Sequence, residues 1–242
     1  MKARFVRFKW ENETRNIATF YFRPQSDYRY EAGQYAVINI PYLNPDNRGT
    51  ERTMTLSSSP HEPLLSITMK IYSKRGSSFK RTLLSLEQDY EVTIYDAMGD
   101  LVLPLDRAIP LVFIAGGVGI ASFVGMIKWL RHTKDSRNIS LFYAISHPAD
   151  EVLQQPFHDY ALTMPILQKT FVASQDVSEI SNDQSSSARL TAADILPHLE
   201  DSSLIYISGT ESMVESIRMQ LIDAGVSRQQ IVFDYFDGYA SL

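Results

Sequence analysis

The stretch IAGGVGIAS, residues 114–122, decides how the second half of this 242-residue chain folds. An apolar run ends here, three glycines follow in the pattern G-G-x-G, and a helix-like segment begins. Glycine allows a tight turn and a close approach of the backbone to a ligand, while a helix N-terminus offers unpaired N–H groups to a phosphate. The stretch predicts a strand–turn–helix unit that binds a phosphorylated ligand, and a purely structural turn is the alternative.

Strand-like apolar runs alternate with helix-like segments from residue 106 to residue 242. The runs cover residues 111–115, 139–145, 166–173, 204–208 and 230–236, and the helix-like segments cover residues 120–132, 150–162, 191–199 and 211–224. Such alternation is typical of a parallel sheet covered on both faces, so we expect a five-stranded, doubly wound domain. Its second strand ends in Ser146-His147-Pro148, without the acidic residue of the ordinary Rossmann fingerprint.

Residues 1–105 alternate apolar and polar positions in the manner of antiparallel strands. The segments are ARFVRFKW (3–10), NIATFYFR (16–23), QYAVINI (34–40), LLSITMKIY (64–72) and YEVTIYD (90–96). Only FKRTLLSL (79–86) has the pattern of a short helix. This half of the chain predicts a small antiparallel barrel, and the domain boundary is expected near residue 105.

Composition excludes several classes of function. The net charge is −5, which disfavours nucleic-acid binding, and it divides into +2 over residues 1–105 and −7 over residues 106–242. The chain has no cysteine, which excludes disulfides, iron–sulfur clusters held by thiolates and cysteine-based zinc sites. Its five histidines lack the spacings of common metal sites. No metal site is expected.

A membrane span is the alternative for residues 108–127, because these 20 positions carry no charge. The segment divides into a strand-like and a helix-like piece around its glycines, which argues against a single transmembrane helix. The first ten residues, MKARFVRFKW, lack the apolar region of a signal peptide. We therefore expect a cytoplasmic protein without a membrane span.

The stretch ERTMTLSSSP, residues 51–60, is either a polar loop or one edge of a cofactor site. Its pattern R-x-x-[ST]-x-x-S in a predicted barrel, followed by G-G-x-G-I at the start of a parallel sheet, resembles the ferredoxin–NADP⁺ reductase superfamily. The matching segments, in the family's order, are AGQY (32–35), RTMTLSSSP (52–60), MKIYSKRGSSFKRTL (69–83), GDLVLP (99–104), AGGVGIAS (115–122), YISGTESMV (206–214) and DYFDGY (234–239). The resemblance implies a six-stranded FAD-binding barrel, residues 1–105, and an NAD(P)-binding domain, residues 106–242.

On the barrel, the resemblance implies that Arg52 pairs with the FAD pyrophosphate, where its planar fork suits phosphate oxygens. It implies that Thr55 lies near flavin N5 and that Met54 takes the place of the usual aromatic residue against the ring. The full set of implied FAD contacts is Arg52, Thr53, Met54, Thr55, Met69, Lys70, Ile71, Gly76, Ser77, Ser78 and Phe79. For Ser77 and Ser78, helix capping is the structural alternative.

On the second domain, the resemblance implies a pyrophosphate turn for NADH or NADPH at the glycines, and it aligns Ser208 with a cysteine beside the nicotinamide. The implied dinucleotide contacts are Gly116, Gly117, Gly119, Ile120, Ala121, Ser174, Gly209, Thr210, Glu211 and Met213. Thr55, Ser208 and Asp234 are the implied catalytic residues. An aromatic ring from Tyr235, Phe236 or Tyr239 either shields the flavin or packs in the core, and Phe236 is counted among the cofactor contacts.

Three positions depart from the family's pattern. Met54 replaces an aromatic residue, Ser208 replaces a thiol, and Ser122 replaces a proline. The choice of dinucleotide stays open. Ser174 is followed by Gln175 and Asp176, which favours NADH because a carboxylate repels the 2′-phosphate of NADPH. Arg189 could reach the same phosphate, so NADPH stays possible.

The implied function is hydride transfer between NAD(P)H and FAD, with electrons passed singly to a separate carrier such as ferredoxin or flavodoxin. A small acidic redox protein suits the basic residues of the barrel, which are Lys70, Lys74, Arg75, Lys80 and Arg81. Two alternatives are a reductase of diffusible flavin or ferric chelates and a non-catalytic nucleotide-binding electron-transfer subunit. The sequence leaves the oligomeric state undetermined.

Overall fold

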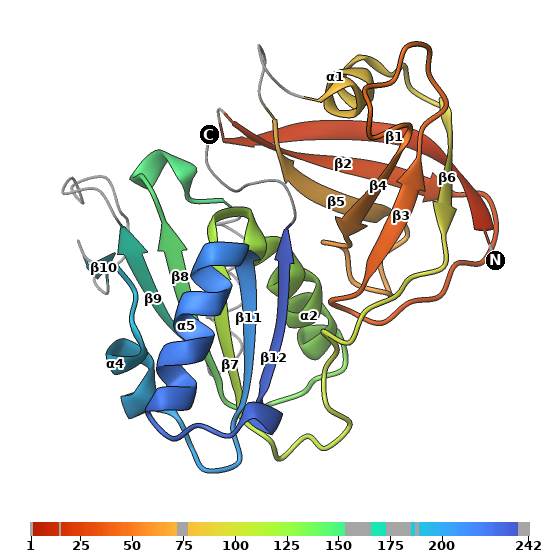
Figure 1. The fold of residues 1–242 in the computed structure, drawn as a ribbon. Coiled ribbons are helices and arrows are strands. Elements are labelled where there is room, and N and C mark those ends of the chain that lie inside the picture. Colours follow the sequence, from red (N-terminus) through yellow and green to blue (C-terminus); the bar gives the residue numbers. More distant parts are fainter. Residues whose placement is uncertain are drawn as a thin grey trace.

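The computed structural model describes residues 2–14, 16–71, 77–152, 166–172, 185–186 and 189–236. Two sheets lie side by side, one in each half of the chain (Figure 1). The first contains β1 (Lys2–Thr14), β2 (Ile17–Pro24), β3 (Tyr35–Asn39), β4 (Glu51–Thr55), β5 (Leu65–Lys70) and β6 (Glu91–Tyr95). Its order is β4-β3-β6-β1-β2-β5, and every pairing is antiparallel.

The first sheet closes on itself directly after β4. Leu56 forms an antiparallel bridge with Ile67 of β5, and the Ser57 N–H donates to the carbonyl oxygen of Ser66 at 2.8 Å. Alternate residues of the strands point inward, and Phe5, Phe20 and other apolar side chains fill the interior. The helix α1 (Ser78–Ser85) packs against this barrel through Phe79 and Leu83.

The second sheet is entirely parallel, with the order β10-β9-β8-β7-β11-β12. Its strands are β7 (Leu111–Gly116), β8 (Ile139–Ile145), β9 (Ile166–Val172), β10 (Ser185–Ser186), β11 (Leu204–Thr210) and β12 (Ile231–Phe236). Its helical segments are η1 (Gly117–Gly119), α2 (Ile120–His132), η2 (Pro148–Asp150), α4 (Ala192–Ile195), η3 (Leu196–His198), α5 (Glu211–Asp223) and η4 (Arg228–Gln230). Helices α2 and α5 cover opposite faces, as the separate core clusters around them and Figure 1 show.

The predicted fold class is confirmed. All five predicted parallel strands are present, and the only addition in the described residues is the two-residue edge strand β10. The sixth barrel strand is β4, inside the stretch that resembled a cofactor site. Most of the helix predicted over 150–162 lies outside the described residues. The uncharged segment 108–127 divides into β7 and the start of α2, and no helix in the described part of the chain is long and apolar enough to cross a membrane.

The two halves of the chain share a hydrophobic interface. Ile17, Ala32 and Leu101 belong to the same buried cluster as Phe123 and Met126 of α2. An ion pair between Glu62 and Lys128, with a shortest N–O distance of 2.9 Å, spans the same interface. The predicted domain boundary near residue 105 falls in the connection between β6 and β7, and it stays a prediction.

Candidate active site

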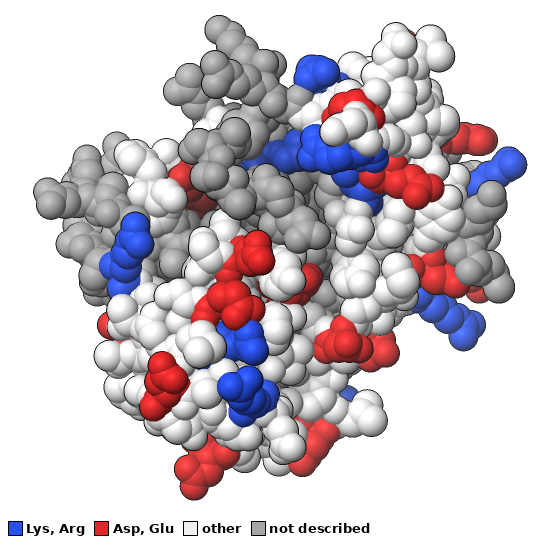
Figure 2. Space-filling view, viewed as in Figure 1, with Lys and Arg blue, Asp and Glu red and all other residues white. Residues whose placement is uncertain are grey.

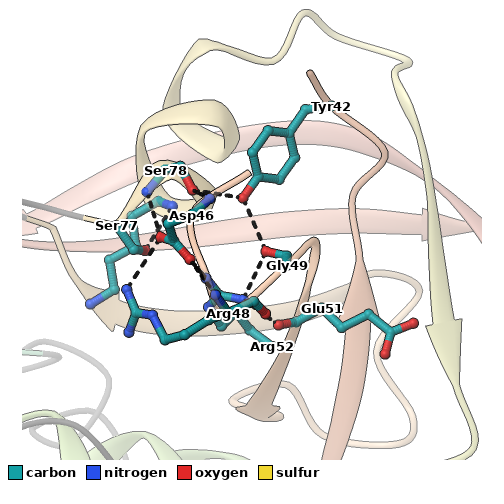
Figure 3. Close-up of polar contacts among 9 residues, drawn as sticks. Tyr42, Asp46, Arg48, Gly49, Glu51, Arg52, Ser77 and Ser78 are labelled. Carbon is teal, nitrogen blue, oxygen red and sulfur yellow. Dashed lines mark hydrogen bonds and ion pairs between the residues drawn. The ribbon is translucent and has the colours of Figure 1, made fainter. Parts of the chain in front are cut away.

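Arg52 lies on β4 with its guanidinium turned toward the preceding loop (Figure 3). Its Nη1 donates to the carbonyl oxygens of Arg48, Gly49 and Glu51 at 2.9, 3.0 and 2.5 Å. Its Nη2 donates to Oδ1 of Asp46 at 2.8 Å. The guanidinium carbon also lies 5.2 Å from the centre of the Phe79 ring. These contacts fix the orientation of the cation that the sequence assigns to a phosphate.

Asp46 joins this arginine to the N-terminus of α1. Its Oδ2 accepts the backbone N–H of Ser78 at 3.1 Å, and its own N–H donates to Oγ of Ser78 at 2.8 Å. The hydroxyl of Tyr42 lies 2.9 Å from the same Oγ. Burial opposes ionisation, but hydrogen bonds from Ser78 and Arg48 outweigh it and hold the pKa of Asp46 below its ordinary value.

Positive charge is in excess around the first turn of α1. Ser77 caps this helix, its Oγ accepting the Lys80 N–H at 3.3 Å. Burial, and then the charges of Arg48 and Arg52, lower the pKa of Lys80 to about 8. On the face shown in Figure 2, Lys and Arg side chains gather on the barrel next to the second domain. This edge therefore attracts anions.

The remaining residues of β4 alternate between its two faces. Thr53 is exposed, Met54 is half-buried against the barrel core, and Thr55 is buried. On β5, Met69 is buried and Lys70 is half-buried, as is Ile71 just beyond the strand. Met54 thus has one side in the core, which leaves only part of it for contact with a flavin ring.

The serines of ERTMTLSSSP have a structural role. Ser57, Ser58 and Ser59 are buried, and Oγ of Ser58 accepts the backbone N–H of Ser66 at 2.9 Å across the seam of the barrel. The carbonyl oxygen of Ser58 would lie 2.7 Å from a Cβ at Gly125, so α2 packs directly on this segment. Only the first part of the stretch borders the candidate site.

The glycine turn after β7 lies beside the barrel. Gly117 has φ +53°, and a Cβ at this position would lie 3.8 Å from Nζ of Lys70. No side chain caps α2, and no acidic residue lies in its first turn. The side chains of Ile120 and Ala121 are buried, so only their backbone atoms can contact a ligand. With no side chain in the capping position, the start of this helix suits an anion supplied by a ligand.

The turn also packs closely against the start of α5. A Cβ on Gly116 would lie 2.2 Å from Sδ of Met213, and one on Gly119 would lie 2.2 Å from the carbonyl oxygen of Ser208. A Cβ on Gly209 would lie 3.2 Å from Cα of Gly116. The structure therefore brings together most of the residues that the sequence assigned to the dinucleotide, with Thr210 and the exposed Glu211 at the next helix start.

Ser208 differs from the expectation of an accessible catalytic group. Its side chain is fully buried, with Oγ 3.3 Å from Oγ of Ser122 on α2. The geometry does not support a direct catalytic role for this hydroxyl. Ser122 and Ser208 are two of the three departures from the family's pattern, and here they contact each other.

Asp234 and Tyr235 lie on opposite faces of β12. Val232 packs in the core beside α2 and Ile231 in the core beside α5, so strand alternation places Asp234 on the side of α2, which faces the barrel. Tyr235 stacks with Phe233 on the α5 side, with ring centres 6.5 Å apart. Tyr235 therefore lies on the face of β12 away from the barrel, and its contact with a flavin stays a prediction.

Some predicted residues cannot be placed. Phe236 pairs with Thr210 in the register of β12, but its side chain lies outside the described residues. The other predicted residues outside them are Lys74, Arg75, Gly76, Ser174, Gln175, Asp176 and Tyr239.

Part of the second half of the chain matches a known protein family. Residues 113–219 match the family model described as an oxidoreductase NAD-binding domain. A ferredoxin NADP⁺ reductase from Neisseria gonorrhoeae, described with bound FAD and NADP, superposes with a TM-score of 0.78 at 16% identity over 97% of this chain and 98% of that one. The predicted resemblance to the ferredoxin–NADP⁺ reductase superfamily is thus confirmed in the fold, and residues 113–219 match a family of NAD-binding oxidoreductase domains. The match supports the predicted nicotinamide dinucleotide site, because the family is described as NAD-binding, while FAD stays a prediction for this chain.

Further proteins resemble the chain in fold or in sequence. The FAD/NAD-binding domain of a nitric oxide dioxygenase from Vibrio cholerae has a TM-score of 0.79 at 18% identity, covering 97% of this chain and 98% of that one. The terephthalate 1,2-dioxygenase reductase component 1 of Comamonas is 25% identical over 86% of this chain and 60% of its own length. Flavohemoprotein A of Dictyostelium discoideum is 25% identical over 93% of this chain and 57% of its own length. The chain thus spans about 60% of the length of these curated relatives.

Proposed function

We propose that this chain is a flavoprotein reductase that binds FAD on its barrel and takes a hydride from NADH or NADPH bound at the glycine turn. The observation that carries this proposal is the proximity of Lys70 to Gly117, because it brings the strand assigned to the flavin ring next to the turn assigned to the dinucleotide. Bound flavin would supply the chemistry, accepting two electrons as hydride and releasing them singly.

The barrel edge fits the phosphates of FAD. Arg48 and Arg52 both form ion pairs with the carboxylate of Asp46 there, and their charges act on Lys80 of α1. Nε of Arg52 is buried and has no hydrogen-bond partner within the part of the chain that the structure describes. The first turn of α1 adds backbone N–H groups, so the donors match the needs of a pyrophosphate.

The shared interface fixes the two half-sites relative to each other. The hydrophobic cluster around α2 and the Glu62–Lys128 ion pair oppose separation of the domains. Hydride transfer requires the reacting atoms to lie about 3–3.5 Å apart, which a fixed interface favours. Asp234 lies on the side of β12 that faces the barrel, and we assign its carboxylate to the region where the dinucleotide and the flavin meet.

We propose NADH as the preferred donor and a separate redox protein as the acceptor. The donor preference rests on Asp176 in the sequence, while the exposed Arg189 is the residue that would admit NADPH. The basic edge of the barrel favours an acidic carrier of the ferredoxin or flavodoxin class. An oxygenase component is a further acceptor class, because a relative of this chain is named as the reductase of a dioxygenase.

Gel filtration and an acceptor panel test these assignments. We expect flavin to co-elute with the protein and to be released as FAD on denaturation, and reduction of an acidic carrier to weaken with added salt. Loss of the flavin, together with turnover of added free flavin, would favour the alternative of a diffusible-flavin reductase. Binding of NADH without any turnover would favour a non-catalytic electron-transfer subunit.

A further inference from the structure

The carboxylate of Asp46 binds the groups that the proposed function assigns to a flavin phosphate. Its Oδ1 accepts from Nη2 of Arg52 at 2.8 Å and its Oδ2 accepts from the Ser78 N–H at 3.1 Å, at the start of α1. An arginine fork together with a helix N-terminus is a donor set that phosphate also selects. Figure 3 shows Asp46 between these two partners.

Asp46 is held firmly in this position. Its backbone N–H and both carboxylate oxygens are hydrogen-bonded, and Oδ1 also accepts the Arg48 N–H at 3.1 Å. The side chain is 26% exposed and that of Arg52 is 13% exposed, so the pair is partly shielded from water. The hydrogen bonds keep the pKa of Asp46 low, so the carboxylate is charged at neutral pH.

One carboxylate does not neutralise this edge of the barrel. Arg48 and Arg52 both ion-pair with Asp46, and their charges add to the effect of burial in lowering the pKa of Lys80 to about 8. Burial is the larger cause of this shift, and the two guanidinium charges add to it even with Asp46 in place. A further anion is therefore still attracted to the site.

We propose that Asp46 is an internal anion that shapes the phosphate cradle when no cofactor is bound and competes with the flavin phosphate for Arg52 and the N-terminus of α1. This inference rests on the proposed flavin site and deepens it, because it makes Asp46 the residue that sets how strongly the site favours a phosphorylated flavin. On binding, the phosphate replaces the carboxylate on Nη2 of Arg52 and on the Ser78 N–H. No covalent bond changes.

The test compares Asp46→Asn with the wild type in binding inorganic pyrophosphate, FAD and riboflavin by isothermal titration of flavin-free protein. Asparagine keeps the size and one acceptor but removes the competing charge. We expect pyrophosphate and FAD to bind roughly 10- to 100-fold more tightly, the range that one charge-assisted hydrogen bond is worth, and riboflavin to bind unchanged.

Glu51→Gln is the matched control. It removes the same charge from a neighbouring position, but the Glu51 carboxylate accepts from Asn39 and Tyr95 at 2.9 Å, away from the cradle. We expect the ratio of FAD to riboflavin affinity to stay as in the wild type. Circular dichroism confirms folding, and Asp46→Ser serves if the asparagine variant does not fold.

The outcomes separate this inference from the proposed function. Unchanged or weaker pyrophosphate binding by Asp46→Asn would overturn the competition, as would an equal gain for riboflavin. If pyrophosphate binds more tightly and no flavin binds to either protein, the role of Asp46 stands and the flavin function fails.

Discussion

Helices α1 and α2 both begin at the candidate site, but the protein groups at their N-termini differ. At α1, Ser77 caps the helix and Asp46 accepts the Ser78 N–H, so protein groups already occupy the position for an anion. At α2, Gly119 offers no side-chain cap and the first turn has no acidic residue. The N-terminus of α1 is therefore closed, because a carboxylate of the protein already binds it, whereas the turn before α2 is open, because no side chain of the protein caps it.

The difference matches the ligands that we assign to the two halves. A nicotinamide co-substrate must enter and leave at each turnover, and an open turn favours that exchange. A flavin phosphate meets an internal competitor, but it also meets three cations, Arg48, Arg52 and Lys80, which favour its retention. The contrast can be tested separately at each helix.

The largest effect is expected at the open turn, from Gly119→Ala. A Cβ at this position would lie 2.2 Å from the backbone oxygen of Ser208, which cannot move freely, so we expect the free energy of unfolding to fall by about 3 kcal/mol. Gly117→Ala is the control: its Cβ has ordinary contacts, and its positive φ costs about 1 kcal/mol. Urea unfolding measures both. Equal losses in the two variants would contradict the close packing of the turn on β11.

A smaller loss of stability is expected at the closed terminus, from Arg52→Ala. The variant loses hydrogen bonds to three carbonyl groups and to Asp46, which we expect to lower the free energy of unfolding by about 2 kcal/mol and to abolish FAD retention. The exposed Arg48, paired with Asp46 only at 3.4 Å, is the control, with an expected loss of about 0.5 kcal/mol for Arg48→Ala. Full FAD content in Arg52→Ala would remove this residue from the cofactor site.

The pH dependence of FAD binding tests the charge excess at α1. Lys80 has a pKa of about 8 before an anion binds, and a bound phosphate favours its protonated form. FAD affinity should therefore be constant well below pH 8 and should fall as the pH rises through this value, by up to about tenfold for each unit by which binding raises the pKa. Lys80→Met should flatten the profile. A profile that stays identical in this variant would show that Lys80 does not sense the phosphate.

The smallest effect is expected where α2 packs on β11, at the contact between Ser122 and Ser208. A double-mutant cycle with alanine at each position should give a coupling energy of about 0.5–1 kcal/mol, because their contact is a single buried hydrogen bond between neutral groups. Urea unfolding of the two single variants and the double variant measures it. A coupling energy of zero would mean that the two serines pack independently.

The sequence predicted the turn before α2 but not the carboxylate at the N-terminus of α1. The turn at 114–122 was predictable because glycines, an apolar run and a helix-like segment lie together in the chain. Asp46 was not predicted, because it contacts Ser78, 32 positions away, from an irregular loop that has no periodicity. Its place six residues before Arg52, after Asn44 and Pro45 in a turn-prone segment, was the only signal available.

Long-range packing explains the other differences from the sequence. Ser122 and Ser208 are 86 positions apart, so their contact depends on the parallel sheet and not on any local pattern. Ser57–Ser59 looked like part of a cofactor site, but closure of the barrel and packing of α2 bury them. Which terminal aromatic residue faces the barrel could not be predicted, because the face of Tyr235 depends on the pairing of β12 with β11.

Anaerobic reduction of the bound flavin tests most directly the claim that the two halves form one hydride-transfer site. FAD-loaded protein would be mixed with NADH, with NADPH, and with NADH carrying deuterium at C4 of the nicotinamide. We predict bleaching of the flavin absorption, faster with NADH than with NADPH and slower with the deuterated donor. A flavin that stays oxidised with both dinucleotides would contradict the account.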